Sequence, residues 1–363
     1  MNLELFIAQR LYGTRKGARR ISRPAVAIAQ WGVAIGAVIM IASICIIVGF
    51  KQQVREKLYG FGGHIQIMSY SNDATAAAPL TADSILLAGL RAIPNIAHVQ
   101  QYTHKQGLIV ANDEYEGVLI KGVCGDYDLS LIESHIVEGT IPNFSDTASS
   151  GSIVLSQSMA ERIKAKVGDK INIYFLDKGI RARKQTVAAI YNTHLTEFDN
   201  AIAFTDIYTT RSIHDWKRDE SSAIEIHISD YSLLEQTRED VTGIATDAAY
   251  RNDETLSVPT IEELNLHMFE WLSLLDQTVW LILILVVCIA AFTMISGLLI
   301  IILEKSNLIG ILKAIGAKDV SIRRIFIYYA CFVIGKGIII GNIIGLALCY
   351  LQQQFKIVAI DPE

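Results

Sequence analysis

The sequence has little charge, and the charge it has is unevenly placed. Charged residues make up 19% of the 363 residues and hydrophobic residues 51%, whereas soluble domains average about 25% charged. No charged residue occurs in 25–50 or in 277–303, and Lys336 is the one charge in 325–351. A membrane-crossing helix needs about 20 apolar residues, and buried helices of soluble proteins seldom run this long. We therefore predict three membrane spans, at residues 25–50, 278–303 and 325–351.

Cysteine is also scarce outside these stretches. Four of the five cysteines lie in the predicted spans, and only Cys124 lies in the long segment between the first two. That segment can form no internal disulfide, so disulfide bonds do not contribute to its stability. A domain of more than 200 residues can bury a sufficient core without them.

Motifs for catalysis and metal binding are missing. The sequence has no Gly-x4-Gly-Lys-Ser/Thr loop, no His-Glu-x-x-His and no Cys-x-x-Cys, and its eight histidines are scattered. His194, Glu197 and Asp199 lie close together in sequence, but three polar residues in a loop are far more often solvated than catalytic. We predict a chain without enzyme activity, without a metal or cofactor of its own, and without a nucleic-acid partner.

The distribution of charge predicts an orientation. Residues 1–24 and 304–324 together hold eleven basic and three acidic residues, whereas residues 51–276 hold nineteen basic and thirty-two acidic ones. Positive charge in short flanking segments stays in the cytoplasm. We expect a cytoplasmic N-terminus, a large domain at 51–277 outside the cytoplasm and a cytoplasmic loop at 304–324. The first apolar run is too long for a signal peptide, and no small-x-small cleavage site follows it.

Apolar residues at helical spacing flank the first two spans. Within residues 1–24, the positions of Leu3, Phe6, Ile7, Arg10 and Leu11 indicate a helix along the inner membrane surface. Two further stripes predict stalk helices continuous with the spans, one ending at Gly60 and one starting at a Thr260-x-x-Glu263 capping box. The alternative is that these helices only pack under the external domain. The stripes are Phe50, Val54 and Leu58, and Ile261, Leu264, Met268, Trp271 and Leu275.

Between the stalks, the pattern predicts a mixed α/β domain. Alternating apolar residues indicate strands, and helical spacing indicates two short helices. The expected strands are 64–68, 170–176, 185–191 and 223–228, the expected helices are 86–93 and 159–167, and the loosest loops are 71–78 and 143–151.

The loop at 304–324 contains a short amphipathic helix. Leu308, Ile311, Leu312 and Ile315 form one apolar face, and Gly316 lies where the helix should end. A helix of this kind suits a groove on a cytoplasmic partner, although it could also rest on lipid. We predict contact with a partner through Glu304, Lys305, Leu308, Ile309, Gly310, Ile311, Leu312, Lys313, Ala314, Gly316 and Ala317.

This loop resembles the coupling helix of ABC-transporter permeases of the FtsX/MacB superfamily. Its Ile309-to-Ala317 segment is close to the pattern Ile-Gly-Ile-Leu-Lys-Ala-Leu-Gly-Ala, although Lys305 replaces the usual arginine and Leu308 an acidic residue. The lipoprotein-releasing branch (the LolC/LolE type) is resembled more closely still, over essentially the whole chain. The segments that carry this likeness are 6–11, 60–67, 153–156, 168–171, and 190–193 with 197–199.

The resemblance implies a set of partners. It implies a separate cytoplasmic ATPase that binds ATP and Mg²⁺, a second permease subunit in a homo- or heterodimer, membrane lipid, and an acylated lipoprotein held between spans. A periplasmic lipoprotein carrier is a further partner in this branch, but the turn at 176–184 is shorter than the hairpin that docks it. Helix packing or a substrate path is expected at Gly32, Gly36, Ser43, Lys336 and Asn342.

The resemblance also implies a fourth span and a cellular location, and it leaves two alternative functions. Family members have four spans, so we expect a fourth beyond the three, with residues 352–363 forming an external tail. The expected location is the inner membrane of a Gram-negative bacterium. The alternatives are a MacB-like efflux pump, whose ATPase is fused to the N-terminus, and an FtsX-like scaffold for cell-wall hydrolases, whose external domain is smaller.

Overall fold

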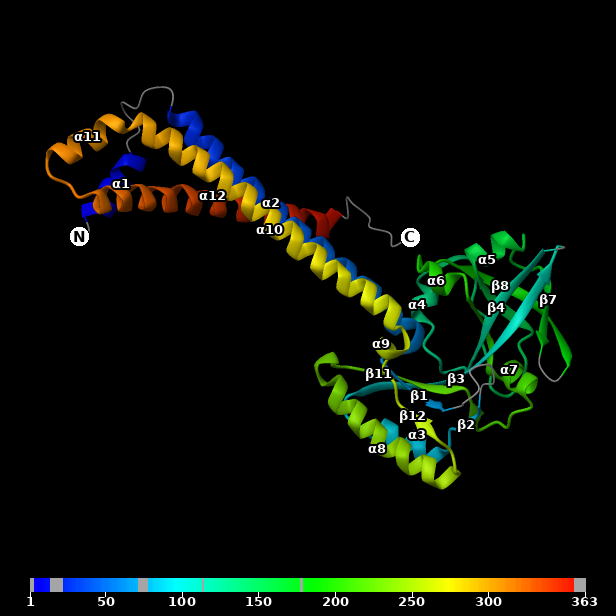
Figure 1. Ribbon diagram of the computed structural model, residues 1–363. Coiled ribbons are helices and arrows are strands. Elements are labelled where there is room, and N and C mark those ends of the chain that lie inside the picture. The colour runs from blue at the N-terminus through cyan, green and yellow to red at the C-terminus, as the bar shows by residue number, and fades with distance from the viewer. Residues whose placement is uncertain (1–2, 14–21, 71–77, 113, 177–178, 356–363) are drawn as a thin grey trace. The chain divides into compact units, whose positions relative to one another are not determined.

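The computed structural model describes residues 3–13, 22–70, 78–112, 114–176 and 179–355 (Figure 1). The chain divides into two compact units. The first, here the membrane unit, comprises the described residues up to 52 and from 270 to 355, and the second, the soluble unit, comprises the described residues from 53 to 269. Each unit is described separately below.

Three long helices contribute to the membrane unit. They are long and apolar enough to cross a membrane, and each of the three predicted runs lies within one of them. Two of them, α2 and α10, extend past the division between the units. The helices of this unit are α1 (Leu3–Gly13), α2 (Ser22–Gly62), α10 (Leu266–Glu304), α11 (Ser306–Ala314) and α12 (Asp319–Phe355).

Small residues bring α12 close to α2. A Cβ atom added to Gly341 would lie 2.7 Å from both the Ala34 carbonyl oxygen and the Ala37 Cβ, and one added to Gly337 would lie 2.9 Å from the Gln30 carbonyl oxygen. Small-x-x-x-small patterns allow such close approach of backbones in membranes. The contact depends on glycine because any side chain there would push the helices apart.

Helix α1 packs on the membrane unit along one side. Ala8 is fully buried and Leu11 packs against a small core that includes Ala29 and Val333. Leu3 and Phe6, which the sequence pattern placed on the apolar face, are exposed in this chain. The helix therefore packs against the protein through Ala8 and Leu11 and leaves Leu3 and Phe6 exposed.

The soluble unit is built on one extended sheet of ten described strands. The order is β12-β1-β11-β3-β4-β9-β6-β8-β5, and β7 pairs with both β3 and β8. The strands are β1 (Ile65–Ser69), β3 (Ile96–Ala111), β4 (Glu114–Val123), β5 (Ile136–Gly139), β6 (Ser152–Ser156), β7 (Lys170–Leu176), β8 (Ile180–Tyr191), β9 (Ile202–Asp206), β11 (Ala223–Ile228) and β12 (Leu256–Ser257), with β2 (Leu80–Thr81) and β10 (Glu220–Ser221) pairing separately.

Long strand β3 divides this sheet into two halves. Its first part pairs with β11, and its second part pairs with β4 and β7. Since β4, β9, β6, β8 and β7 pair in succession and β7 returns to β3, the second half closes into a six-stranded barrel. Its interior is apolar, with Ile109, Ile120, Ile153, Leu155, Ile173 and Phe175 in the core.

Helices cover the other half of the sheet. In Figure 1, α3 and α8 lie side by side against the sheet formed by β1, β11 and the start of β3. Their apolar faces bury a second core that includes Leu86, Leu90 and Val241. The remaining helices are α3 (Ser84–Arg91), α4 (Ser130–Glu133), α5 (Gln157–Arg162), α6 (Thr196–Asp199), α7 (Ile207–His214), α8 (Leu234–Asn252) and α9 (Ile261–Leu264), with a 3-10 turn at Tyr231–Leu233.

Most predicted elements of this α/β domain are present, but several ends differ. The first stalk helix ends at Gly62 rather than Gly60, because Gly63 takes the left-handed conformation (φ 67°) that terminates helices. The predicted helix at 159–167 ends at Arg162, since Lys164 also has a positive φ. Of the predicted loops, 143–151 has no regular structure, and most of 71–78 lies outside the described residues.

The second predicted stalk is interrupted. Its capping box is formed by Thr260 and Glu263, but Asn265 leaves helical geometry, so α9 and α10 are separate helices. The predicted stripe is also shifted: Leu264 and Trp271 are exposed, and Leu272 is the buried residue of that turn. On the stripe of the first predicted stalk, Val54 and Leu58 are buried and belong to the soluble unit.

Candidate functional site

Helix α11 is a defined unit between two long helices. The Gly316 N–H donates to the Lys313 carbonyl (2.9 Å) and the Ala317 N–H to the Leu312 carbonyl (2.9 Å), and Gly316 has φ 94°. This bonding is the Schellman termination, in which a left-handed glycine satisfies the last carbonyls of a helix. The end predicted at Gly316 is therefore confirmed. An ion pair between Lys313 and Asp319 (3.0 Å) links α11 to the start of α12.

None of the side chains of α11 is buried in this chain. Ile311 is 58% and Ile315 79% exposed, whereas Leu308, Ile309 and Leu312 are half-buried. The predicted apolar face is thus present, but the protein itself covers only part of it. The exposed part is available to another molecule.

The other predicted contact residues surround this exposed face. Gly310 and Ala314 are exposed, and a Cβ atom added to Gly310 would meet nothing within 4 Å. Glu304 and Lys305 lie at the α10 end of the helix and approach each other to 4.0 Å, while Ala317 is half-buried beyond the glycine. A partner could approach closely along the small residues.

The residues predicted for helix packing or a substrate path fall into two groups. A Cβ atom on Gly32 would lie 2.8 Å from the Thr293 methyl carbon, and one on Gly36 would lie 3.3 Å from Val286, so both glycines face α10. Lys336 and Asn342 are exposed on α12, and Ser43 on α2 is half-buried. The structure therefore brings the two glycines to a helix contact and does not bring Lys336 or Asn342 to the same place.

A small cavity opens between α2 and α10 near the division between the units, within the membrane unit. Its volume is about 260 Å³, and five of its six lining residues are apolar, Asp276 being the exception. The Lys51 ammonium lies 2.7 Å from the Asp276 carboxylate and joins the two helices beside the cavity. The lining residues are Ile44, Ile47, Val48, Asp276, Val279 and Trp280.

Within the soluble unit, a polar contact and a ring stack join the C-terminal end of α2 to the rest of the unit. The buried Lys57 donates to the Thr193 carbonyl (2.6 Å), and the Thr193 hydroxyl donates to Asp199 (2.7 Å). Phe61 is 3% exposed and stacks on Phe198 at 4.8 Å between ring centroids. Asp199, interpreted from the sequence as solvated, is in fact buried; burial raises its pKa, and the bond from Thr193 opposes the rise.

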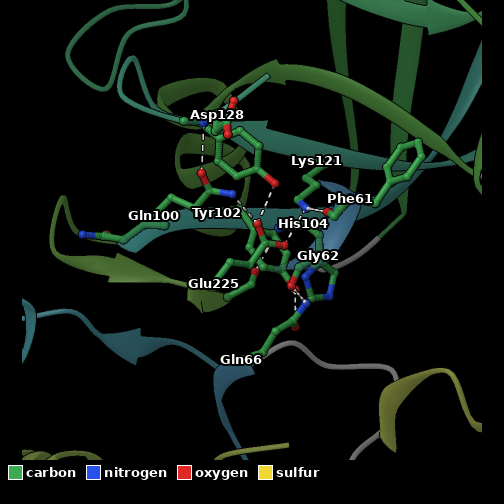
Figure 2. Close-up of polar contacts among 12 residues, drawn as sticks. Phe61, Gly62, Gln66, Gln100, Tyr102, His104, Lys121, Asp128 and Glu225 are labelled. Atoms are coloured by element: carbon green, nitrogen blue, oxygen red, sulfur yellow. Dashed lines mark hydrogen bonds and ion pairs between the residues drawn. The ribbon is translucent and has the colours of Figure 1, made fainter. Parts of the chain in front are cut away.

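A buried ion pair forms the second connection. Figure 2 shows Lys121 pointing toward Glu225, and the ammonium lies 2.6 Å from both the Glu225 carboxylate and the Phe61 carbonyl oxygen. The Tyr127 hydroxyl donates to the other Glu225 oxygen (2.6 Å), as does Gln100 (3.0 Å). Burial lowers the pKa of Lys121 and Glu225 opposes this effect, whereas burial, with Glu225, holds the pKa of Tyr127 well above its usual range.

The sequence pattern did not predict the buried contacts among Lys121, Glu225 and the end of α2. Glu225 alternates with Ile224 and Ile226, so the period-2 pattern places it on the solvent face. In the structure both faces of β11 are covered, and Glu225 is fully buried. The one available signal was Lys121, a charge that interrupts the apolar run from Val118 to Val123.

Two protein families match the chain. Residues 27–244 match the MacB-like periplasmic core domain, and residues 280–361 match the FtsX-like permease C-terminal family. Among solved structures, the periplasmic region of MacB from Actinobacillus actinomycetemcomitans is 13% identical, with a TM-score of 0.39 over 58% of this chain and 95% of that one.

Curated relatives align over most of the chain. The lipoprotein-releasing system transmembrane protein LolC of Neisseria meningitidis is 24% identical over 331 residues, which is 87% of this chain and 75% of the relative. The corresponding protein LolE of Haemophilus influenzae is 22% identical over 328 residues, with the same coverage of 87% and 75%. These matches confirm the resemblance found in the sequence. The chain therefore belongs to the FtsX/MacB superfamily of ABC-transporter permeases, with a MacB-like periplasmic core domain and an FtsX-like C-terminal segment.

Proposed function

We propose that this chain is a permease subunit of an ATP-driven complex that extracts acylated lipoproteins from the inner membrane. In this proposal the ATPase is a separate cytoplasmic subunit that binds ATP and Mg²⁺, and a second permease completes the complex. The N-terminus and α11 are cytoplasmic, and the soluble unit is periplasmic. This orientation rests on the excess of basic residues in the short segments at 1–24 and 304–324.

The observation that carries the proposal is the exposed face of α11. This nine-residue helix has a fixed C-terminal end, and both Ile311 within it and Ile315 at its C-cap are exposed. Burying such side chains in a groove contributes roughly 1.5–3 kcal/mol each, which makes this face a favourable part of a larger interface with a partner subunit. Helix-in-groove docking of this kind allows a cytoplasmic ATPase to move α10 and α12, which flank α11.

The cavity between α2 and α10 supports a lipid-anchored substrate. Its walls are apolar, with Val279 and Trp280 from α10 facing Ile44 and Ile47 from α2. Each methylene group of an acyl chain that is buried there would contribute about 0.8 kcal/mol. The cavity would therefore bind a short part of the chain. The Lys51–Asp276 ion pair joins the same two helices, and their separation would have to break it.

The names of the relatives support an acylated lipoprotein as the substrate. LolC and LolE are named as transmembrane proteins of lipoprotein-releasing systems. In the proposed mechanism, ATP-driven closure of the ATPase displaces α11, and α2, whose residues belong to both units, carries the displacement to the periplasmic domain. A periplasmic carrier would then receive the released lipoprotein.

Co-purification tests the proposal. The full chain would be isolated from native membranes in mild detergent and its partners identified, and the complex would then be reconstituted in liposomes with an acylated lipoprotein. We expect a stoichiometric ATPase and ATP-dependent release of the lipoprotein. The matched control is Ile311→Asp, which should keep the chain folded but lose the ATPase.

Other partners would contradict the proposal in distinct ways. An ATPase together with an outer-membrane duct would indicate an efflux pump, and an ATPase together with a cell-wall hydrolase would indicate a scaffold. Absence of any ATPase would overturn the assignment of α11 as the coupling helix.

A further inference from the structure

We propose that Lys121 and Glu225 clamp the last turn of α2 to both halves of the soluble unit, so that the three move as one rigid body. Lys121 is then a positioning residue, which acts through the α2 backbone rather than on a substrate. The three groups that form this clamp all lie within the soluble unit. Its consequence for lipoprotein release rests on the proposed function.

The contacts of Lys121 point to this role. Its ammonium, on β4, donates to the Phe61 carbonyl at the end of α2 and to Glu225 on β11, both at 2.6 Å. It also lies 4.4 Å from the centre of the Tyr102 ring and 5.1 Å from that of Tyr127. A cation at a helix C-terminus satisfies carbonyls that have no partner within the helix and complements the helix dipole. One side chain therefore joins three segments that are far apart in sequence.

The location of the pair matters because β3 is shared between the halves of the sheet. Tyr102 pairs with Ala223 of β11 on one side and with Val123 of β4 on the other. The barrel and the helix-covered half meet at this residue, where a sheet could otherwise flex. Lys121 belongs to the barrel and Glu225 to the other half, so their ion pair spans the meeting point (Figure 2).

Neighbouring contacts attach the same turn of α2 to each half separately. A Cβ atom on Gly60 would lie 2.7 Å from Leu131, which packs against the barrel-side core with Phe61. A Cβ atom on Gly62 would lie 2.6 Å from Ile261, and Gln66 of β1 donates to the Gly62 carbonyl (2.8 Å). The two glycines thus permit close packing on both sides of the turn.

The buried charges are fully partnered, which makes the clamp specific. Both Glu225 oxygens accept bonds from charged or polar groups, and the pair is 6% and 0% exposed at Lys121 and Glu225. Buried ion pairs seldom stabilise a protein more than apolar residues of the same volume would. The distinctive property of this pair is the orientation it imposes on the α2 carbonyl.

Amide hydrogen exchange on the full chain in detergent tests the clamp. Lys121→Met alone would leave Glu225 unpaired and could unfold the domain, so the decisive variant is Lys121→Met/Glu225→Gln, which removes both charges and keeps amide contacts to Tyr127 and Gln100 possible. The matched control is Lys164→Met, which breaks the exposed ion pair Lys164–Glu114 (2.9 Å) at the far end of β4.

We expect the double variant to keep its Tm within a few degrees of the wild type. The amides of residues 58–63 should exchange about tenfold faster or more, because local opening of this turn no longer breaks a buried contact. The control should leave exchange at 58–63 unchanged. Unchanged protection in a folded double variant would overturn the clamp. Equal loss of protection throughout the soluble unit would also overturn it, because the pair would then contribute only to general stability.

A reconstituted complex separates this inference from the proposed function. If the wild type releases lipoprotein, the double variant should hydrolyse ATP at a similar rate but release several-fold less lipoprotein per ATP, since motion of α2 reaches the two halves unequally. Release equal to that of the wild type would contradict the positioning role. If the wild type releases none, the proposed function fails and the exchange result still decides the clamp.

Discussion

Helix α11 and the last turn of α2 are both short helical segments with apolar side chains, yet they differ in what covers them. In α11 no residue is buried, and Ile315 is 79% exposed. In the last turn of α2, Leu58 is fully buried and Phe61 is 3% exposed. The first segment lacks a cover in this chain, and the second is covered by residues from several distant strands and loops.

The difference separates two kinds of contact. A contact made within one chain can use buried charges, as at Lys121, because every polar group finds a fixed partner during folding. The residues that contact another subunit are exposed to water or lipid before assembly. Helix α11 accordingly has small and moderately sized apolar side chains without buried ions. Substitutions at the two segments should therefore affect different measurements.

The largest expected effect is at the buried segment. Phe61→Ala should destabilise the soluble unit by about 3–5 kcal/mol, because it removes a buried ring and leaves a cavity beside Phe198. Thermal unfolding of the purified chain would show this as a lower Tm. Ile311→Ala, in the exposed segment, should leave the Tm unchanged, and a comparable loss there would erase the distinction between the two segments.

Binding of the ATPase should instead depend on the exposed segment, α11. Ile311→Asp should reduce recovery of the ATPase about tenfold or more, because a charge in an apolar groove costs at least the contribution of the buried side chain. The Tm of the isolated chain should not change. Asn307→Asp adds the same charge to an exposed position of the same helix, and if it caused an equal loss, charge rather than the apolar face would govern docking.

Packing within the membrane unit provides a third comparison. Gly341→Leu should destabilise the α2–α12 contact by about 1–3 kcal/mol, because the new side chain meets the Ala34 backbone. Gly335→Leu is the control, since nothing lies within 4 Å of a Cβ atom there. One helical turn beyond the contact of Gly345 with Ile41, Cys349 on α12 and Cys45 on α2 carry free thiols.

These native thiols give a direct readout of the α2–α12 contact. Mild oxidation should form a Cys45–Cys349 disulfide in the wild type and in Gly335→Leu, and much less of it in Gly341→Leu. The yield can be measured by intact mass after alkylation. An equal yield in all three proteins would mean that the glycine does not set the distance between the helices.

The smallest expected effect is on the pH dependence of the soluble unit. Burial, with His227 nearby, lowers the pKa of His64 to about 4, and burial, with His214 nearby, lowers that of His104 to about 4. Between the unfolded pKa of about 6.5 and these values, the unfolded chain binds more protons, so stability falls as the pH decreases.

We expect the Tm to drop by a few degrees between pH 7 and pH 5. His64→Asn, which can still accept the bond from the Ile228 N–H, should make this change shallower. A Tm that is constant or higher at pH 5 would contradict the depressed pKa values. The exposed segment α11 contains no histidine, so ATPase binding through it should show no matching change.

The sequence by itself determined the three spans, because long runs without charge have few structural alternatives to a membrane helix. It also determined the end of α11 at Gly316 and the capping box at Thr260, since both depend on residues within one turn. The family followed from such local patterns together with the short motifs of the external domain.

Only the tertiary structure determined the buried contacts among Lys121, Glu225 and Phe61. Lys121, Glu225 and Phe61 are separated by 60 to more than 100 residues in the chain, and no periodic pattern links residues so far apart. Asp199 looked solvated because neighbouring polar residues in a loop usually are, yet it is buried and holds Thr193. Local patterns report which face of an element is apolar, whereas the burial of a charge depends on what distant strands place above it.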